Sequence, residues 1–377
     1  MSGNKRIRVG ILFGGRSGEH EVSLASAASV MRALDPEKYE ALPIGISKDG
    51  RWLVGGRAHK MLPEVLKSGE RVVLPPDPSA ASLMPIAPAA GQPSTRVDVV
   101  FPVLHGTFGE DGTVQGLLEL AGLPYVGAGV LASAVGMDKD VQKRLFKEAG
   151  LPIVPFVAVA RSEWEHTPDQ VAERVKRKLK FPVFVKPATL GSSVGMTRVK
   201  KESELPAAMD EAASFAQKIL VERAVNAREI EVAVLGNADP RASVPGEVVP
   251  HREFYDYTAK YLEQGTQLVI PAKLTSRQVK QFQDYAVRAF RAIDGTGMAR
   301  ADFFLLRRGG RIYVNELNTI PGFTSISMYP KMWEASGLPY SRLIDKLIEL
   351  AFEQHREKSR TKYSIDLPAG SGGALEG

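Results

Sequence analysis

Runs of apolar residues mark two buried strands in the first third of the chain, each followed by a glycine-containing turn. The run at 7–13 predicts a strand that leads through its turn into a helix over 19–34, which carries small residues on one side. The run at 98–104 predicts a second strand, which ends at His105-Gly106. Because open parallel sheets bind ligands beyond the carboxyl ends of their strands, we expect part of a binding site at this edge.

Beyond about residue 127 the pattern changes to antiparallel strands with helices on one side. The predicted elements of this part are helices over 138–149 and 276–293 and strands over 181–187, 218–223 and 229–234, followed by a hairpin. The segment 75–93, rich in Pro, Ala and Ser, is interpreted as a surface insertion. The expected fold class is therefore α/β in the first part and α+β in the rest, with no internal repeat.

The predicted hairpin combines one arginine with three oxygen-bearing side chains. Arg300 and Asp302 lie two residues apart on one strand, so they share a face, and Glu316 and Asn318 share a face on the next. A turn at 308–311, marked by two glycines, joins the strands. Carboxylate and amide oxygens suit Mg²⁺, so the hairpin is a candidate site for magnesium and phosphate.

The length of the turn decides whether these two faces coincide. A two-residue loop at Gly309-Gly310 would pair Asp302 with Leu317 and direct Asp302 to the wrong side. A three-residue loop at 308–310 would pair Asp302 with Glu316 and bring the four polar groups together. A magnesium site therefore predicts a loop with an odd number of residues or a β-bulge.

A second candidate site for phosphate begins at Lys186, near the end of a predicted strand, and continues into a glycine–serine loop at 191–195. This is not a P-loop, because the lysine precedes the glycines and no Gly-Lys-Ser/Thr sequence opens a helix. Backbone amides of such a loop can still close over triphosphate oxygens, while lysine supplies positive charge. The alternative interpretation is a plain hairpin turn.

Two glutamates and a further lysine extend the candidate nucleotide site. Glu222 ends an apolar strand and could accept a hydrogen bond from an adenine amino group, while Glu229 could accept hydrogen bonds from ribose hydroxyls. Taken alone, each is more typical of a surface carboxylate. Together with Lys139, Lys186 and the oxygen ligands of the hairpin, they favour a site for a magnesium nucleotide.

The densest aromatic cluster, at 254–261, lacks strand or helix periodicity and is interpreted as a loop that folds over a ligand. The alternative is a surface loop whose aromatic rings pack on the body of the protein. His20, His59 and His105 lack the spacing of zinc ligands. His105 is a candidate for contact with a substrate.

Composition narrows the class of protein. With 377 residues, 44% hydrophobic and 24% charged, the chain resembles a soluble globular protein of two or three domains. No apolar run approaches the ~18 residues of a membrane span, and no secretory cleavage pattern follows the first run. The absence of cysteine excludes disulfides and thiolate metal sites and fits a reducing compartment, so we expect a cytoplasmic protein with no membrane partner.

The net charge of +6 is mild for this length. The densest basic run, at 176–180, ends a predicted helix, where it complements the helix dipole. No stacking aromatic residues are interleaved with it, so we expect no nucleic-acid partner. A site for an anionic small molecule explains the surplus of positive charge as well.

Taken in order, these motifs resemble those of the D-alanine:D-alanine ligases of the ATP-grasp superfamily over about residues 7–351. The segments that carry the resemblance are 14–23, 104–112, 186–187 with 191–195, 255–261 and 300–327. It implies a three-domain ATP-grasp fold that grips ATP between its central and C-terminal domains. The implied parts are an N-terminal Rossmann-like parallel-sheet domain at 1–127, a central domain with a phosphate lid at 128–223, a C-terminal domain with the magnesium site and a lid loop at 224–357, and a disordered tail at 358–377.

The resemblance also implies a reaction. ATP phosphorylates the carboxylate of one D-alanine, and the amine of a second D-alanine attacks the acyl phosphate, giving D-alanyl-D-alanine, ADP and phosphate for peptidoglycan precursors. The implied cofactors are two Mg²⁺ or Mn²⁺ ions, and the implied assembly is a homodimer. Similar ligases that form a D-alanine:D-lactate ester depart from the tyrosine pattern of the lid, whereas this chain keeps Tyr257, Lys260 and Tyr261, which favours amide formation.

The implied site residues fall into groups by what they bind. The resemblance implies that Glu19 binds the ammonium group of the first D-alanine and that Ser192 and Tyr261 lie beside it and hold the lid closed. It implies that Arg300 and the backbone amide of Gly322 stabilise the developing oxyanion. Ser327 and the backbone of Met328 are implied at the carboxylate of the second D-alanine, and His105 is a further candidate for contact with a substrate. At ATP the resemblance implies Lys139, Lys186, Ser193, Glu222, Glu229, Tyr257 and Lys260. At the metal ions it implies Asp302, Glu316 and Asn318.

Three other interpretations compete with this one. Another ATP-grasp carboxylate:amine ligase would share the nucleotide and metal residues but not necessarily the set of Glu19, Ser192 and Tyr261. A nucleotide-binding regulatory protein would retain the fold without turnover, and the presence of every charged residue needed for catalysis counts against it. A nicotinamide-dependent dehydrogenase is excluded because the Gly-x-Gly-x-x-Gly fingerprint is absent.

Overall fold

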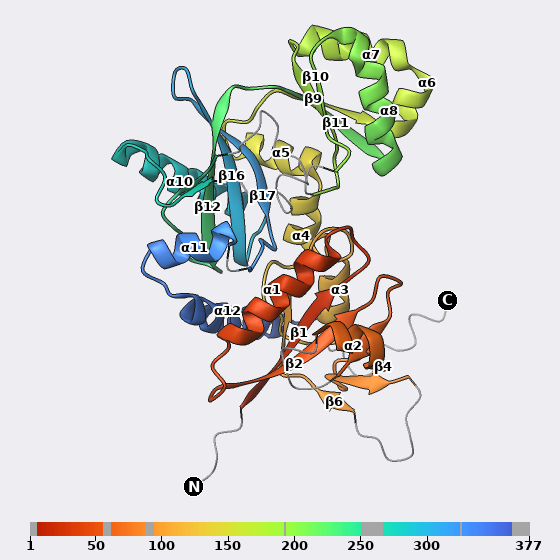
Figure 1. The fold of residues 1–377 in the computed structure, drawn as a ribbon, viewed down its shortest axis with the longest axis vertical. Coiled ribbons are helices and arrows are strands. Elements are labelled where there is room, and N and C mark those ends of the chain that lie inside the picture. Colours follow the sequence, from red (N-terminus) through yellow and green to blue (C-terminus); the bar gives the residue numbers. More distant parts are fainter. Residues whose placement is uncertain are drawn as a thin grey trace, which may run out of the picture.

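Three β-sheets follow one another along the chain, each covered by helices (Figure 1). The computed structural model describes residues 6–55, 62–86, 94–191, 194–249, 267–324 and 326–363. The seven-stranded sheet of the N-terminal part lies at one end of the molecule and the four-stranded sheet of the central part at the other, with the six-stranded sheet between them (Figure 1).

The first sheet contains the predicted parallel strands. Its order is β6-β5-β4-β3-β2-β1-β7, and β1 (Ile7–Gly14) pairs in parallel with β2 (Tyr39–Ile46) and β7 (Val99–Pro102). The remaining pairs are antiparallel. The strands predicted at 7–13 and 98–104 are thus confirmed, in a Rossmann-like core of three parallel strands. The other elements of this part are α1 (His20–Ala33), β3 (Trp52–Val54), α2 (Leu62–Ser68), β4 (Glu70–Val73), β5 (Ser82–Pro85), β6 (Thr95–Arg96) and α3 (Thr113–Leu120).

Part of the segment 75–93 belongs to this sheet. Strand β5 lies between β4 and β6, and its Leu83 is 1% exposed in the same core as Leu12. The interpretation as a surface insertion was therefore wrong for these residues, because a composition rich in Pro, Ala and Ser concealed a strand that pairs with the free side of β4. Residues 87–93 lie outside the described ranges.

The central sheet is antiparallel, with the order β10-β9-β11-β8. One of its faces is apolar, and Val185 and Val221 pack there against Val175 of α7 and Met209 of α8. This packing explains why the apolar runs at 181–187 and 218–223 form strands. The elements of this part are α4 (Val130–Met137), α5 (Lys139–Glu148), β8 (Phe156–Ala160), α6 (Arg161–His166), α7 (Pro168–Lys178), β9 (Val183–Pro187), β10 (Thr197–Val199), a 3₁₀ turn (Glu202–Glu204), α8 (Leu205–Phe215) and β11 (Lys218–Arg223).

The third sheet is also antiparallel, with the order β15-β14-β12-β16-β17 and with β13 paired to β12. Its apolar face packs on α10, where Ile230, Phe303 and Val314 lie in one core with Phe282 and Phe290. The opposite face carries polar side chains. The elements of this part are β12 (Ala227–Gly236), β13 (Arg241–Ala242), β14 (Gly246–Val249), β15 (Gln267–Val269), α10 (Ser276–Ala292), β16 (Gly297–Leu306), β17 (Ile312–Asn318), α11 (Met328–Ala335) and α12 (Tyr340–Ser359).

Two helices begin at their predicted positions because capping side chains satisfy the free amides of the first turn. The carboxylate of Asp138 accepts hydrogen bonds from the backbone amides of Asp140 at 3.0 Å and Val141 at 3.1 Å, at the start of α5. Thr275 and Gln278 form a capping box at the start of α10. These caps fix the direction of the two helices that flank the third sheet.

Helix α12 ties the C-terminal end of the chain to the N-terminal sheet (Figure 1). Its apolar residues Leu343, Ile344 and Leu347 are buried in one core with Val9 of β1 and Phe101 of β7. The N-terminal sheet therefore depends on a helix that lies more than 200 residues further along the chain. None of the helices in the described ranges is both long and apolar enough to cross a membrane.

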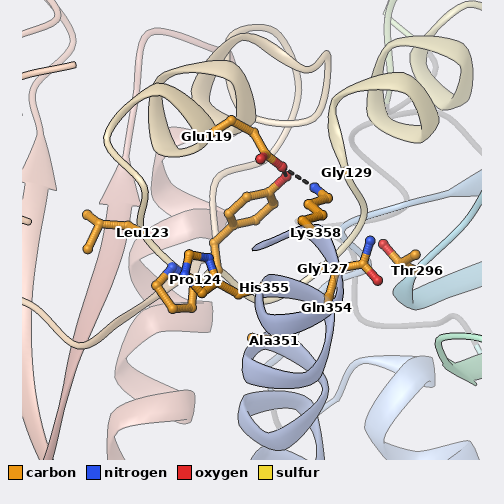
Figure 2. A pocket seen from close by; sticks show the side chains of 11 residues that line it. Glu119, Leu123, Pro124, Gly127, Gly129, Thr296, Ala351, Gln354, His355 and Lys358 are labelled. Atoms are coloured by element: carbon orange, nitrogen blue, oxygen red, sulfur yellow. Dashed lines mark hydrogen bonds and ion pairs between the residues drawn. The ribbon is translucent and has the colours of Figure 1, made fainter. Parts of the chain in front are cut away.

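The end of α12 corrects the expected start of the tail. Lys358 points toward Glu119 at the end of α3 and forms an ion pair with it (Figure 2). The ammonium group of Lys358 also lies 5.5 Å from the ring centre of Tyr125. The expected tail began at residue 358, but α12 continues to Ser359, because these contacts hold its last turn against the N-terminal part. Residues 364–377 lie outside the described ranges.

Candidate active site

The polar face of the third sheet gathers charged side chains from three adjacent strands. Glu231 of β12 is opposite Asp302 of β16, and Asp302 is opposite Glu316 of β17. Arg300 and Asn318 form the next opposed pair. Because opposed residues in an antiparallel sheet point to the same side, these five side chains share the face that α10 leaves uncovered.

A β-bulge produces the pairing that the candidate metal site requires. Asp302 pairs with Glu316, but Phe303 pairs with Val314, so Asn315 is an extra residue in β17. The predicted pairing of Asp302 with Glu316 is confirmed, and so is the bulge alternative. The three-residue loop is wrong, because the turn occupies four residues, 307–310, and the bulge restores the register.

Two carboxylates hold the guanidinium group of Arg300 in this face. Its Nε and Nη2 donate to the two oxygens of Asp302, each at 2.7 Å, and its Nε lies 3.2 Å from Glu231 Oε2. Burial alone would lower the pKa of Arg300, but the charges of Asp302 and Glu231 raise it well above its ordinary value. Glu231 was missed from the sequence, although its place two residues after Glu229 on the same strand was the signal for it.

Lys139, at the start of α5, reaches the other metal-ligand candidate. Its Nζ lies 3.1 Å from Glu316 Oε2 and donates to the carbonyl of Leu190 at 2.9 Å. Its backbone amide donates to the carbonyl of Ala188 at 2.9 Å. Lys139 therefore connects the hairpin carboxylate to the loop that follows Lys186.

Lys186 and Glu222 meet in a buried cluster that the sequence did not predict in full. Glu222 is 3% exposed, and its two oxygens lie 2.5 Å from Lys186 Nζ and 2.7 Å from Lys143 Nζ. Burial opposes the ionisation of Glu222, but Lys143 and Lys186 outweigh it and lower its pKa. The interpretation of Glu222 as a surface carboxylate is therefore wrong. Lys143 was missed, although a lysine three residues before the buried Phe146 on an amphipathic helix was a detectable signal.

Replacing Glu222 by glutamine is expected to lower the melting temperature by about 5–10 °C at neutral pH, because two buried lysines then face each other without a carboxylate. Since the folded pKa of Glu222 lies below the ordinary 4.5, its stabilisation is complete above pH 4.5 and is lost as the pH falls through the folded pKa. Thermal melts of both proteins at several pH values measure this. Their difference should shrink below pH 4.5, and a difference that grows there contradicts the assignment. The exposed Glu211 of α8, changed to glutamine, is the control.

The substrate side of the site brings the N-terminal sheet to the loop after β9. A side chain at Gly106 would lie 3.1 Å from Glu19 Oε2, and one at Gly191 would lie 3.4 Å from the same oxygen. The carboxylate of Glu19 therefore lies between the end of the first sheet and the glycine–serine loop. Glycine at these positions lets both backbone segments approach Glu19 closely.

His105 joins the first sheet to the turn that follows β17. Its Nδ1 lies 3.2 Å from the carbonyl oxygen of Ile320, and its Nε2 lies 3.2 Å from Ser26 Oγ. The same hydroxyl accepts a hydrogen bond from the backbone amide of Phe323 at 3.4 Å. Ser26, on the helix predicted over 19–34, was not singled out in the sequence, where a serine on a small-residue helix face carried no distinct signal.

Gly322 and Ser327 lie side by side before α11. A Cβ atom at Gly322 would lie 2.9 Å from Ser327 Oγ, and this hydroxyl accepts a hydrogen bond from the backbone amide of Thr324 at 3.0 Å. Ser327 is the N-cap residue of α11, whose first turn has no side-chain cap. The side chain of Met328 is 6% exposed and packs in the core, so only its backbone is suited to the role expected of it.

The structure thus brings most of the expected residues to one region between the sheets. Those that it places there are Glu19, His105, Lys139, Lys186, Glu222, Arg300, Asp302, Glu316, Asn318, Gly322 and Ser327. Glu229 lies on the same face of β12 as Glu231. The predictions for Ser192, Ser193, Tyr257, Lys260 and Tyr261 fall outside the described ranges.

The donor set on the hairpin fits a hard divalent cation. In the part of the chain that the structure describes, no three His, Asp or Glu side chains group as a metal site. The candidate ligands on the hairpin are instead two carboxylates and one amide. These are Asp302, Glu316 and Asn318, all oxygen donors of the kind that Mg²⁺ prefers. Asn318 is oriented by its own backbone, because its Oδ1 accepts a hydrogen bond from the amide of Ile320 at 3.0 Å.

Comparison with known proteins gives a consistent result along nearly the whole chain. The family described as "D-ala D-ala ligase N-terminus" matches residues 8–128, and that described as "D-ala D-ala ligase C-terminus" matches residues 145–349. The D-alanine--D-alanine ligase of Heliobacterium modesticaldum is 50% identical over 353 residues, 93% of this chain and 96% of that protein. The enzyme of the same name from Bacillus cytotoxicus is 49% identical over 363 residues, 96% and 99% of the two chains.

Solved structures agree in fold. The D-alanine-D-alanine ligase from Coxiella burnetii superposes with a TM-score of 0.84 at 39% identity and covers 95% of this chain and 97% of its own. The VanG D-Ala:D-Ser ligase from Enterococcus faecalis gives a TM-score of 0.83 at 36% identity, covering 92% and 100%. The expected ATP-grasp fold is thereby confirmed, whereas the domain boundaries expected from the sequence stay a prediction. By sequence and by fold, the chain belongs to the D-alanine–D-alanine ligase family.

Proposed function

We infer that this chain joins two D-alanine molecules to D-alanyl-D-alanine at the expense of ATP, as a step toward peptidoglycan precursors. The observation that carries this inference is the convergence of all three sheets. Glu19, in the turn between β1 of the first sheet and α1, lies beside the loop after β9, and Lys139 connects that loop to Glu316 of the third sheet. Relatives about 50% identical over nearly the full length bear the name D-alanine--D-alanine ligase.

The first half of the reaction transfers the γ-phosphoryl group of ATP to a carboxylate oxygen of the first D-alanine, and ADP leaves. Lys139 and Lys186 are suited to neutralise phosphate charge, because the Lys139 ammonium group donates to the loop between β9 and β10 and Lys186 lies near the end of β9, just before that loop. Asp302, Glu316 and Asn318 would hold two Mg²⁺ or Mn²⁺ ions, which would supply charge neutralisation at the phosphates. Glu229 and Glu222 are proposed at the ribose and adenine.

The second half of the reaction forms the amide bond. The amine of the second D-alanine attacks the acyl carbon and loses a proton, and phosphate leaves with the former carboxylate oxygen. Glu19 would hold the ammonium of the first D-alanine, and Arg300 with the Gly322 amide would stabilise the oxyanion. The start of α11, whose first turn has no side-chain cap, would receive the second carboxylate together with the Ser327 hydroxyl.

Residues outside the described ranges complete the proposed site. Ser192 and Tyr261 would close the lid beside Glu19, and Ser193, Tyr257 and Lys260 would contact ATP. Exclusion of water by this lid would protect the acyl phosphate from hydrolysis. Because the reaction consumes ATP, we propose that it proceeds in the cytoplasm, and we propose a homodimer as the assembly.

A second candidate activity differs only in the second substrate. The VanG D-Ala:D-Ser ligase shares the fold at 36% identity, so D-serine is the competing acceptor that its name specifies. Discrimination between an acceptor methyl and an acceptor hydroxymethyl depends on the second subsite, near Ser327 and the start of α11.

Phosphate release from Mg-ATP, with products identified by mass, tests the function directly. We expect release with D-alanine alone, yielding D-alanyl-D-alanine, and none with L-alanine. Mixtures of D-alanine with D-serine or D-lactate should still yield the D-alanine dipeptide as the main product. A mixed dipeptide or an ester as the main product would move the chain to the corresponding activity, and ATP binding without any release would contradict the substrate assignment.

A further inference from the structure

Two consecutive residues of α5, Gln142 and Lys143, form hydrogen bonds to the backbone of β17 on either side of Glu316. Gln142 is bonded to the backbone of Leu317, and Lys143 is bonded to the backbone of Asn315. Both side chains are fully buried, at 0% exposure. Both residues can therefore act on Glu316 through the backbone of β17, and Lys143 also contacts Glu222, which is proposed at adenine.

The amide of Gln142 acts as a neighbouring strand would. Its Nε2 donates to the carbonyl of Leu317 at 2.9 Å, and its Oε1 accepts from the amide of Leu317 at 3.0 Å. The same Nε2 donates to the carbonyl of Gly136 at 2.9 Å. Since β17 is the last strand in the order of its sheet, these bonds satisfy backbone groups that the ladder itself leaves unpaired.

Lys143 supports the bulge itself. Its Nζ donates to the carbonyl of Asn315, the extra residue of β17, at 2.8 Å and lies 2.7 Å from Glu222 Oε1. Burial lowers the pKa of Lys143, and the charge of Glu222 opposes this effect. A single buried side chain thus connects the bulge of the metal-binding strand to the carboxylate proposed at adenine.

The bulge decides which way Glu316 points. Val314 and Leu317 are both buried in the apolar core, although they are three residues apart, because the bulge at Asn315 reverses the alternation of faces. Without the bulge, Glu316 would share the face of Val314 and point into the core. Holding the bulge therefore keeps Glu316 and Asn318 on the face of Asp302.

We propose that Gln142 and Lys143 are positioning residues that hold the bulge of β17 and thereby place Glu316 and Asn318 for metal binding, with Lys143 also placing Glu222. The inference rests on the proposed function, because it takes these two residues as metal ligands. Outer partners that orient metal ligands typically contribute 10–100-fold to metal affinity, which is about the effect expected here.

Binding of Mn²⁺ in the presence of ADP, followed by electron paramagnetic resonance of the free ion, tests the proposal without turnover. Gln142→Met keeps the length of the side chain and removes its hydrogen bonds. It should weaken Mn²⁺ binding about 10–100-fold and leave the affinity for metal-free ADP unchanged. Lys143→Met should weaken both, because Glu222 also loses a partner. The exposed Lys147, on the same helix, changed to methionine, is the control and should alter neither.

If Gln142 had a purely structural role, its replacement would change the stability of the protein without weakening Mn²⁺ binding more than ADP binding. Steady-state kinetics of Gln142→Met should show a raised Mg²⁺ requirement and an unchanged KM for D-alanine. If circular dichroism shows that Gln142→Met does not fold, Gln142→Glu replaces it, because glutamate keeps the acceptor for the Leu317 amide and loses the donors. This variant should also weaken Mn²⁺ binding and leave the affinity for metal-free ADP unchanged. Wild-type Mn²⁺ affinity in a folded Gln142 variant overturns the proposal. Failure of the wild-type chain to bind Mn²⁺ with ADP would instead overturn the metal assignment of the proposed function, and the proposal with it.

Discussion

Glu316→Gln is expected to lose about three orders of magnitude or more in kcat while folding normally. The change removes the negative charge of a proposed metal ligand at constant volume, and metal ions contribute several kcal/mol to stabilisation of charge in transition states of this kind. Glu316 is partly exposed and its ion pair with Lys139 is reached by solvent, and an amide oxygen can still accept from that ammonium group, so the fold should tolerate the amide. Phosphate release under saturating substrates measures the loss, and thermal melting measures the fold.

The exposed Glu334 of α11 offers a matched control for this prediction. Glu334→Gln makes the same chemical change away from the site and should retain wild-type turnover. Activity of Glu316→Gln close to that of the control would contradict the metal assignment. Loss of the folded melting transition in Glu316→Gln would instead show that the charge is needed for the fold.

Arg300→Lys is expected to reduce kcat about 10²–10³-fold, the cost of one donor to a developing oxyanion. Lysine keeps the positive charge between Asp302 and Glu231 but cannot reproduce the paired bonds that the guanidinium makes to both oxygens of Asp302. Since the charge remains, the buried carboxylates stay compensated and the protein should fold. Single-turnover measurements of acyl transfer, with KM for D-alanine determined separately, check the result.

Arg308→Lys, in the exposed turn of the same hairpin, is the control for the arginine change. It should leave kcat unaltered. An Arg300→Lys variant that raises KM for D-alanine at constant kcat would assign Arg300 to substrate binding and would contradict a role at the oxyanion.

The long elements and the hairpin register could be predicted because local patterns determine them. The apolar runs at 7–13 and 98–104 have no alternative to burial, and the caps at Asp138 and Thr275 are set by neighbouring residues. A bulge was one of two alternatives that followed from a geometric condition, since only an odd loop or a bulge brings Asp302 opposite Glu316, and the sequence did not indicate its position at Asn315.

Contacts between distant segments could not be predicted in the same way. Glu222 was predicted at the nucleotide site, but its burial between two lysines was not, because Lys143 approaches from a helix about 80 residues earlier. The strand β5 was concealed by its composition, since its pairing partners decide its structure. The contacts of Ser26 with His105 and Phe323 depend on the packing of α1 against the turn after β17, which local sequence does not indicate.

The position of α12 has a consequence for the order in which the protein forms during synthesis. The strands β1 and β7 are made first, but Leu343, Ile344 and Leu347, which share their core, leave the ribosome only after more than 200 further residues have been translated. Until then the part of the apolar sheet face that α12 covers stays open to solvent and to other chains. The N-terminal part is therefore expected to aggregate when expressed alone, and the nascent chain is a natural client for chaperones that shield apolar surface.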